Sequence, residues 1–365
     1  GISLLSLAVI YFKRHTCTVA IFNAHEKMGY PSIVNSLKSM ISLGLISIYL
    51  LYDNKVIDVI AIQVMSIILM VSLSLYFLHK KIINLRKVRL ILSKAKQKAY
   101  FSESLPFFSL SILFILNARI DILMISWFQT DHDVGLYSAA VELFNISMIM
   151  ATIIHKVFFP VISNQFGNKD WQSLAAISNT GLKYSIVLGT PIAVGLFVLN
   201  TRLVGLIYGD EYSRAIDVLT VFSFSVPMFY GLTLLSWIFS ATENVNVVFR
   251  SSGISVVLNI ILNLVLIPKY GIKGAAIATT TAAGFRTLYL NWFLAKKISR
   301  EIYFFRHFAK PLIASLLMGY VVTQITHLNL FVTIPVGAVV FSICFILTGG
   351  ITKKELVFFK STIKP

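Results

Sequence analysis

The chain has 365 residues, of which 57% are hydrophobic and 13% are charged, and its mean hydropathy is +0.81. Soluble domains carry roughly 45–50% apolar and about 25% charged residues, so this composition excludes a globular domain in water and indicates a membrane protein. The formal net charge of +17 is no argument for nucleic-acid binding, because the basic residues lie between apolar segments, as they do in cytoplasmic membrane loops.

Eleven apolar segments are candidates for membrane spans. A spanning helix needs about 20 predominantly apolar residues. The segments cover residues 1–24, 31–52, 56–78, 104–127, 136–158, 182–200, 215–240, 250–268, 274–294, 311–327 and 330–349. The predicted fold class is therefore an all-α integral membrane protein, built as a polytopic helical bundle.

A short sequence occurs twice, each time at a junction between two spans. Residues 21–26 read IFNAHE and residues 238–243 read IFSATE, 217 positions later. Two matched halves in an apolar chain are typical of transporters built from structural repeats. The second copy ends the fourth span after the basic stretch 79–103, so the first copy should also end a fourth span. We therefore expect three helices, roughly 110 residues, to be missing before Gly1.

The repeat and the basic stretches divide the chain into four predicted parts. Residues 1–78 form the last three helices of a first six-helix lobe, and 79–103 form a basic cytoplasmic linker. Residues 104–294 form a second six-helix lobe, and 295–365 contain a basic loop, two further helices and a tail. The linker mixes lysines with apolar residues, so it suits either a solvated loop or contact with an anionic leaflet.

The basic residues also predict an orientation. Twenty Lys and Arg residues between the spans fall on one side of the membrane and five on the other. By the positive-inside rule, the side with twenty faces the cytoplasm, which places the C-terminus there. The two cysteines, Cys17 and Cys344, lie far apart in apolar segments and form no metal or redox motif.

Basic residues inside the spans are the first candidates for function. A Lys or Arg at the centre of a bilayer costs about 2.5–3.5 kcal/mol, so it should face protein or water. Lys13 and Arg14 interrupt the first span, with the alternative that a loop begins at Lys13. Arg119 and Arg286 lie in later spans. Together these four residues predict a cationic cavity for an anionic group such as a phosphate.

Two acidic residues inside the spans, Asp121 and Glu142, are candidates for proton or sodium coupling. The alternatives are a salt-bridge role for Asp121 and an interfacial position for Glu142. Arg119 and Asp121 are two residues apart and lie on different helix faces, so they do not easily pair with each other. Each therefore needs another partner.

Six motifs follow one another along the second predicted lobe. They are NARID at 117–121, VGLYSAA at 134–140, FPVIS at 159–163, LIYGDEY at 206–212, LNIILN at 258–263 and IPKYGIKGAAIAT at 267–279. This ordered set resembles the polysaccharide-transporter branch, the O-antigen flippases, of the multidrug/oligosaccharidyl-lipid/polysaccharide exporter superfamily. The resemblance implies two six-helix lobes, of the kind found in MATE transporters, followed by a C-terminal helix pair, with the first lobe truncated here.

The resemblance also implies a function. Such flippases move undecaprenyl-pyrophosphate-linked oligosaccharide repeat units of O-antigen or capsule across the bacterial cytoplasmic (inner) membrane by alternating access. They are not enzymes and carry no cofactor or metal. The implied partners are the lipid-linked substrate, membrane lipids and other polysaccharide-assembly membrane proteins. By position, the resemblance carries over Arg119, Asp121 and Arg286, with Lys13 and Arg14 in the first lobe.

Two other functions remain open at this point. A MATE-type multidrug or cation antiporter predicts acidic residues in the cavity, whereas the residues inside these spans are mainly basic. A membrane polysaccharide polymerase needs catalytic groups on a large outer loop, and the longest predicted outer loop covers only about residues 201–214.

Overall fold

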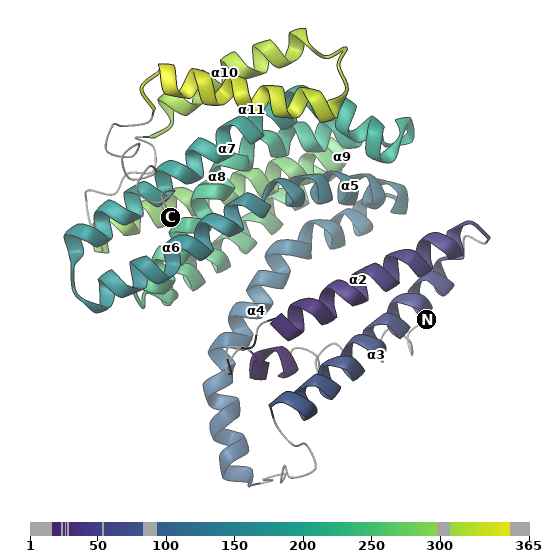
Figure 1. The fold of residues 1–365 in the computed structure, drawn as a ribbon, viewed down its shortest axis with the longest axis vertical. Coiled ribbons are helices and arrows are strands. Elements are labelled where there is room, and N and C mark those ends of the chain that lie inside the picture. The colour runs from purple at the N-terminus through teal and green to yellow at the C-terminus, as the bar shows by residue number, and fades with distance from the viewer. Residues whose placement is uncertain are drawn as a thin grey trace. The chain divides into compact units, whose positions relative to one another are not determined.

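The structure is a computed structural model that describes residues 17–22, 25, 27, 29–52, 55–82, 93–297 and 307–350. In these parts of the chain every regular element is a helix, and eight helices are long and apolar enough to cross a membrane (Figure 1). The prediction of an all-α, polytopic membrane protein is confirmed. Lys13 and Arg14 lie outside the described residues.

The chain forms two compact units, Gly1–Tyr100 and Phe101–Pro365. The first contains a hairpin of α2 (Gly29–Leu50) and α3 (Val56–Lys81). Val34 of α2 packs there against Met70 and Val71 of α3. The Tyr49 hydroxyl donates a hydrogen bond of 2.6 Å to the Asp58 carboxylate at the turn. A short loop and an apolar seam therefore fix these two spans as antiparallel neighbours.

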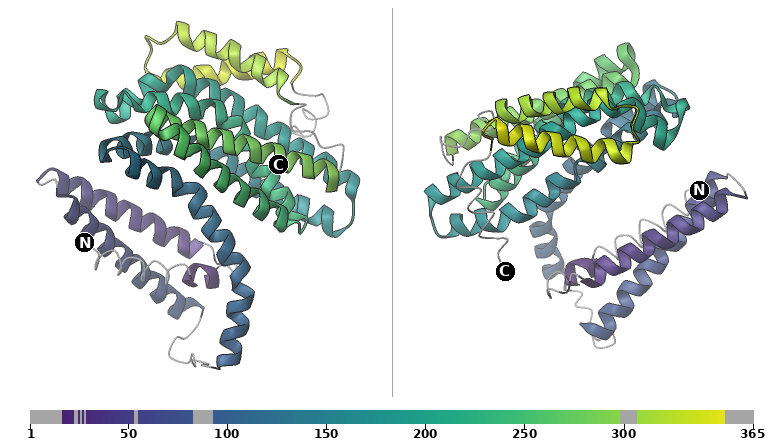
Figure 2. Two further views of the ribbon diagram at one scale, coloured as in Figure 1. Left: turned by 180° about the vertical axis from the view of Figure 1, so that it is seen from behind. Right: turned by 45° about the horizontal axis from the view of Figure 1, so that its top comes forward.

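The second unit contains the remaining long helices (Figures 1 and 2). They are α4 (Lys94–Phe128, which begins in the first unit), α5 (Asp131–Ser147), α6 (Ile149–Gly167), α7 (Trp171–Tyr208), α8 (Ala215–Ala241), α9 (Val245–Lys297), α10 (Ala309–Gln324) and α11 (Leu330–Leu347), with a 3-10 turn, η2 (Asp210–Tyr212). Helix α8 is the most buried of the eight candidate spans and packs against α5, α6, α7 and α9. It is therefore the centre of this unit.

One predicted span is interrupted in the structure. Segment 136–158 crosses a break, because α5 ends at Ser147 and α6 begins at Ile149. The buried Tyr230 hydroxyl of α8 donates a hydrogen bond of 2.6 Å to the Ser147 carbonyl at this break. A side chain from a neighbouring helix therefore satisfies a backbone group that an interrupted membrane helix leaves open.

Two helices, α4 and α7, are longer than the spans that the sequence predicts. Helix α4 begins at Lys94, ten residues before the predicted span 104–127, so part of the predicted linker 79–103 is helical. Helix α7 has 38 residues, where the predicted span was 182–200. Hydropathy locates the apolar centre of a helix, whereas α4 begins in lysine-rich sequence of good helix propensity. At the start of α7, Ser173 donates hydrogen bonds to the Asp170 carboxylate, which lowers the pKa of this exposed group.

The predicted spans 250–268 and 274–294 are the two arms of α9, which folds back on itself at Gly271. Gly271 has a φ of 57°, a conformation that glycine adopts at little cost, and Pro268 precedes it. The arms meet so closely that a Cβ atom on Gly274 would lie 2.2 Å from the Leu266 carbonyl oxygen. The bend therefore depends on two glycines with different roles.

The predicted C-terminal helix pair is α10 and α11, which packs on α7 through a separate apolar cluster. The Arg202 guanidinium of α7 donates a hydrogen bond of 2.6 Å to the Leu328 carbonyl in the α10–α11 turn. At the open end of the pair, Lys310 Nζ donates a hydrogen bond of 2.7 Å to the Gly349 carbonyl. Backbone carbonyls at both ends of the hairpin are thus bonded by basic side chains.

We expect Gly274→Ala to lower the free energy of unfolding by about 1–3 kcal/mol, because the added methyl group forces the two arms of α9 apart. Thermal unfolding of the purified protein in detergent measures this. Gly253→Ala is the matched control on the same helix, since nothing lies within 4 Å of a Cβ there and alanine is the better helix former. Equal melting temperatures for the two variants would contradict the tight-turn interpretation.

Candidate functional site

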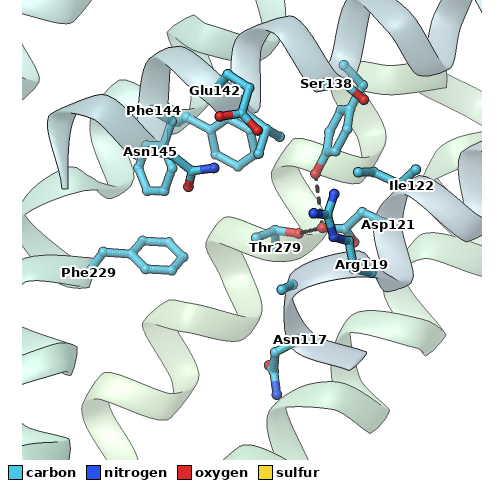
Figure 3. A pocket seen from close by; sticks show the side chains of 14 residues that line it. Asn117, Arg119, Asp121, Ile122, Ser138, Glu142, Phe144, Asn145, Phe229 and Thr279 are labelled. Carbon is cyan, nitrogen blue, oxygen red and sulfur yellow. Dashed lines mark hydrogen bonds between the residues drawn. The ribbon is translucent and has the colours of Figure 1, made fainter. Parts of the chain in front are cut away.

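A pocket of about 240 Å³ opens between α4, α5, α8 and the second arm of α9 (Figure 3). Here the consecutive helices α4 and α5 meet α8 and α9, which follow much later in the chain, so polar side chains of these helices share one water-accessible space. Its lining residues are Asn117, Ala118, Arg119, Asp121, Ile122, Tyr137, Ser138, Val141, Glu142, Phe144, Asn145, Phe222, Phe229 and Thr279. Polar pockets of this kind between membrane helices are the default candidates for substrate or ion pathways.

The structure brings together three of the six predicted site residues. Arg119, Asp121 and Glu142 all line this pocket. Arg286 is not among its lining residues, although it lies on the same arm of α9 as Thr279. The lining therefore contains one cation and two carboxylates, so this pocket by itself is not a cationic cavity.

Asp121 is the most constrained of these residues, with only 7% of its surface exposed. Tyr137 of α5 donates a hydrogen bond of 2.9 Å to Oδ2, and the Thr279 hydroxyl donates a short one to the same oxygen. Asn263 of the first α9 arm donates a bond of 2.7 Å to Oδ1. Neutral donors from three other helical segments therefore hold the carboxylate, and no cation within the described part of the chain pairs with it.

The partners of Asp121 are themselves linked. The Asn263 amide also donates to Asn259 Oδ1 at 3.0 Å, one helical turn away. The Asn259 amide in turn donates to the Thr279 hydroxyl at 3.1 Å, across the two arms of α9. Sequence reasoning used Asn259 and Asn263 only as part of a motif and did not identify Tyr137 or Thr279 as partners. The sequence feature that could have identified this network is the pair Asn259 and Asn263, two asparagines four residues apart in an apolar span.

Arg119 and Glu142 are exposed to the pocket, and neither forms a hydrogen bond or an ion pair among the described residues. Figure 3 shows Glu142 and Asn145 on one side of the space, with Arg119 and Thr279 on the other. Both charged groups are therefore available to a ligand. The absence of an Arg119–Asp121 ion pair agrees with their different helix faces.

Aromatic side chains form the apolar wall of the pocket. The rings of Phe144 and Phe222 stack at a centroid distance of 5.0 Å, and Phe144 meets Phe229 edge-to-face at 5.1 Å. Phe144 and Phe222 are buried, whereas Phe229 is only partly buried and reaches into the space (Figure 3). The packed rings of Phe144 and Phe222 therefore fix the position of the Phe229 ring.

Arg286 occupies a different, half-buried position. Its guanidinium makes only long hydrogen bonds, of 3.4 Å to Ser251 Oγ and 3.5 Å to Ser236 Oγ. No carboxylate pairs with it within the described residues. A cation with weak neutral partners remains a candidate contact for an anion, at a separate place from the pocket.

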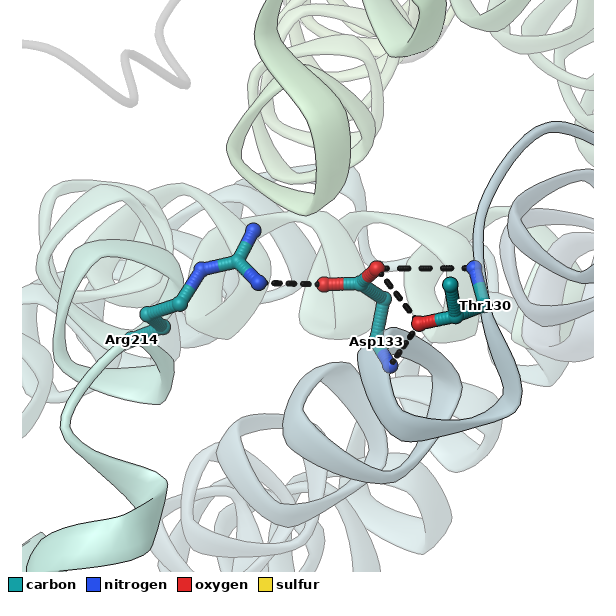
Figure 4. Close-up of polar contacts among 3 residues, drawn as sticks. All are labelled: Thr130, Asp133 and Arg214. Carbon is teal, nitrogen blue, oxygen red and sulfur yellow. Dashed lines mark hydrogen bonds and ion pairs between the residues drawn. The ribbon is translucent and has the colours of Figure 1, made fainter.

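A second polar cluster fixes the start of α5 (Figure 4). Thr130 and Asp133 form a reciprocal capping box, and Arg214, beside α8, approaches Asp133 with a nitrogen–oxygen distance of 2.7 Å. Asp133 is one turn before Tyr137, so this anchor also holds Tyr137 against Asp121. Sequence reasoning missed this pair, because the partners are 81 positions apart and both lie outside the predicted spans.

Within the described residues, no group of three or more His, Cys, Asp and Glu side chains could hold a metal ion.

Several known proteins are similar in sequence. The probable low-salt glycan biosynthesis flippase Agl15 of Haloferax volcanii is 27% identical over 233 residues, covering 61% of this chain and 48% of Agl15. The probable flippase AglR of the same organism is 31% identical over 163 residues, covering 44% of this chain and 34% of AglR. The capsular polysaccharide biosynthesis protein CapF of Staphylococcus aureus is 25% identical over 204 residues, covering 56% and 51%. The chain thus spans about half the length of the curated relatives it matches.

Solved structures show the same fold. The lipid II flippase MurJ in an inward closed conformation has a TM-score of 0.78 at 19% identity, covering 99% of this chain and 74% of that one. The Vibrio cholerae MATE transporter VcmN has a TM-score of 0.55 at 15% identity, covering 78% and 66%. The predicted MATE-like architecture is therefore confirmed.

A family model described as lipid II flippase MurJ matches residues 2–341. This match, together with the flippase relatives, confirms the predicted placement among the flippases of the exporter superfamily. The O-antigen branch and the three missing helices remain predictions. Because the match extends over nearly the whole sequence, the chain belongs to the lipid II flippase MurJ family.

Proposed function

We propose that this chain is the transporting part of a flippase that moves a lipid-linked oligosaccharide across the cytoplasmic membrane. The family match over residues 2–341 is the observation that carries the proposal. The names of the matching family and relatives refer to a lipid II flippase, to a glycan biosynthesis flippase and to capsular polysaccharide biosynthesis. An undecaprenyl-pyrophosphate-linked repeat unit of O-antigen or capsule is the substrate that we infer.

The basic residues inside the spans suit the charged part of such a substrate. Arg119 and Arg286 lack acidic partners among the described residues, so their guanidinium groups are free to bind polar groups of the substrate, which for Arg286 are phosphate oxygens. Lys13 and Arg14 would add to this charge from the first lobe. Alternating exposure of the site to the two sides of the membrane would then move the head group.

Asp121 is the residue that we propose for ion coupling. Its carboxylate is buried and accepts hydrogen bonds from neutral donors among the described residues. A proton or a sodium ion can therefore bind the carboxylate in place of one of these donors, without displacing a cationic side chain. Glu142 was predicted as a second candidate. It is exposed to the open pocket, which better suits contact with a ligand than a closed ion site.

A MATE-type antiporter is the alternative favoured by one observation, the two carboxylates beside aromatic rings in the pocket. Such a lining suits an organic cation. The family match and the flippase relatives outweigh it. The proposed location is the cytoplasmic membrane, with the C-terminus in the cytoplasm and other polysaccharide-assembly membrane proteins as partners.

Disruption of the gene in its host is expected to abolish the surface glycan while completed lipid-linked units accumulate on the cytoplasmic leaflet. Assays of surface polymer and of leaflet-resolved lipid-linked units measure both effects. Units that reach the outer leaflet without being joined would indicate a polymerase. An unchanged glycan with altered drug sensitivity would indicate the antiporter.

Arg119→Ala and Arg286→Ala are each expected to lower the translocation rate about 10- to 100-fold, because a hydrogen bond to a charged group contributes about 1.5–3 kcal/mol. Translocation is measured with alleles restored to the disrupted host, and immunoblotting verifies membrane insertion. Arg250→Ala is the control, since this exposed arginine lies on the first arm of α9, outside the pocket. Wild-type rates in both test variants would remove the proposal that these two arginines contact the substrate.

Asp121→Asn is expected to remove the dependence of translocation on ion gradients and to lower the free energy of unfolding by about 1–3 kcal/mol. The new amide group would face the donors of Tyr137, Thr279 or Asn263 and leave a buried hydrogen bond unmade. Vesicle transport with each gradient collapsed, together with thermal unfolding, measures the two effects. Asp131→Asn, at an exposed position of α5, should change neither.

A further inference from the structure

The pocket combines an aromatic wall with a polar rim. Phe229 reaches into the space and is held by the edge-to-face contact with Phe144. A sugar ring presents apolar C–H groups that pack well on such a ring, since aromatic side chains offer a large, rigid apolar surface. The wall therefore fits a flat, partly apolar ligand better than it fits a bare ion.

Hydrogen-bonding groups with no partner among the described residues surround this wall. Glu142 offers two carboxylate oxygens, and Asn145 offers an amide with both a donor and an acceptor. Arg119 faces them from α4 with donors only. Neighbouring hydroxyl groups on a sugar ring both donate and accept, so they match this mixed set.

The charge of the pocket argues against phosphate as its main occupant. Among the described residues of the lining, Arg119 is the one cation, and the carboxylate of Glu142 offsets it. The Asp121 carboxylate, when ionised, makes the net charge negative. A pyrophosphate group would meet this unfavourable field, whereas a sugar ring would not. The volume of 240 Å³ lies below the roughly 300–1,000 Å³ of pockets for drug-sized ligands, so it suits a single small ring.

We propose that this pocket binds one sugar ring of the transported glycan, packed on Phe229 and hydrogen-bonded by Glu142, Asn145 and Arg119. The proposal rests on the proposed flippase function and deepens it. It separates a sugar site in this pocket from the phosphate contacts, which then fall mainly to Arg286 and to basic residues elsewhere. Glu142 and Phe229 thereby become residues that select the sugar.

The test is saturation-transfer-difference NMR on the purified full chain in lipid nanodiscs. The probes are the methyl glycosides of glucose, galactose, N-acetylglucosamine, rhamnose and glucuronic acid, and inorganic pyrophosphate serves as competitor. The variants are Phe229→Ala, Phe229→Tyr and Glu142→Gln. Phe224→Ala is the matched control, because Phe224 lies on the same helix, is 64% exposed and is not part of the lining.

We expect at least one glycoside to bind, with its affinity about tenfold lower in Phe229→Ala and Glu142→Gln and unchanged in Phe224→Ala. Phe229→Tyr should restore binding, because it keeps the aromatic face, and pyrophosphate should not compete. Binding of no glycoside, equal binding by Phe229→Ala and wild type, or competition by pyrophosphate would each overturn the sugar site.

Translocation in the disrupted host separates this proposal from the proposed function. If wild type restores leaflet transfer while no glycoside binds the pocket, the flippase function stands and the sugar site is wrong. If wild type restores no transfer, the proposed function itself is wrong. If Phe229→Ala binds the glycoside more weakly and also transfers the natural substrate more slowly, both are supported.

Discussion

A carboxylate inside a membrane protein is the constraint on which the pocket depends. Removing a charged group from water costs far more free energy than one contact returns, so Asp121 needs several well-placed donors. Tyr137, Asn263 and Thr279 supply them from α5 and from both arms of α9. Three helical segments are thereby tied to α4 at one point, and any shift of α5 or α9 would leave a buried polar group unsatisfied.

The same arrangement determines which groups remain available to a ligand. Because Arg119 is two residues from Asp121, it projects from another face of α4, toward the open side of the pocket. The capping box at Asp133 and its contact with Arg214 hold the start of α5, the helix that carries both Tyr137 and Glu142. A base of hydrogen-bonded side chains thus supports a rim whose charged groups pair with no other side chain in the described part of the molecule.

The pocket also changes the interpretation of the cationic cavity. Arg119 and Arg286 were equivalent candidates in the sequence, yet only Arg119 lines the pocket. Arg286 lies seven residues beyond Thr279, and at 1.5 Å per residue this places it about 10 Å further along the helix. Spacing along one helix gives this distance, but only the hydrogen bonds between α9 and α4 show which level of the helix borders the pocket.

The sequence by itself determined the membrane class, the apolar centre of most spans and the ionisable residues that need partners. Those properties are local, because the hydropathy of about 20 residues decides whether a helix enters a bilayer. The tertiary structure decided the α5–α6 break, the partners of Asp121 and the joining of Arg119, Asp121 and Glu142 in one space. These features depend on contacts between different helices, such as those of Tyr230 with Ser147 and of Asp121 with Asn263, and no local pattern encodes which helices pack together.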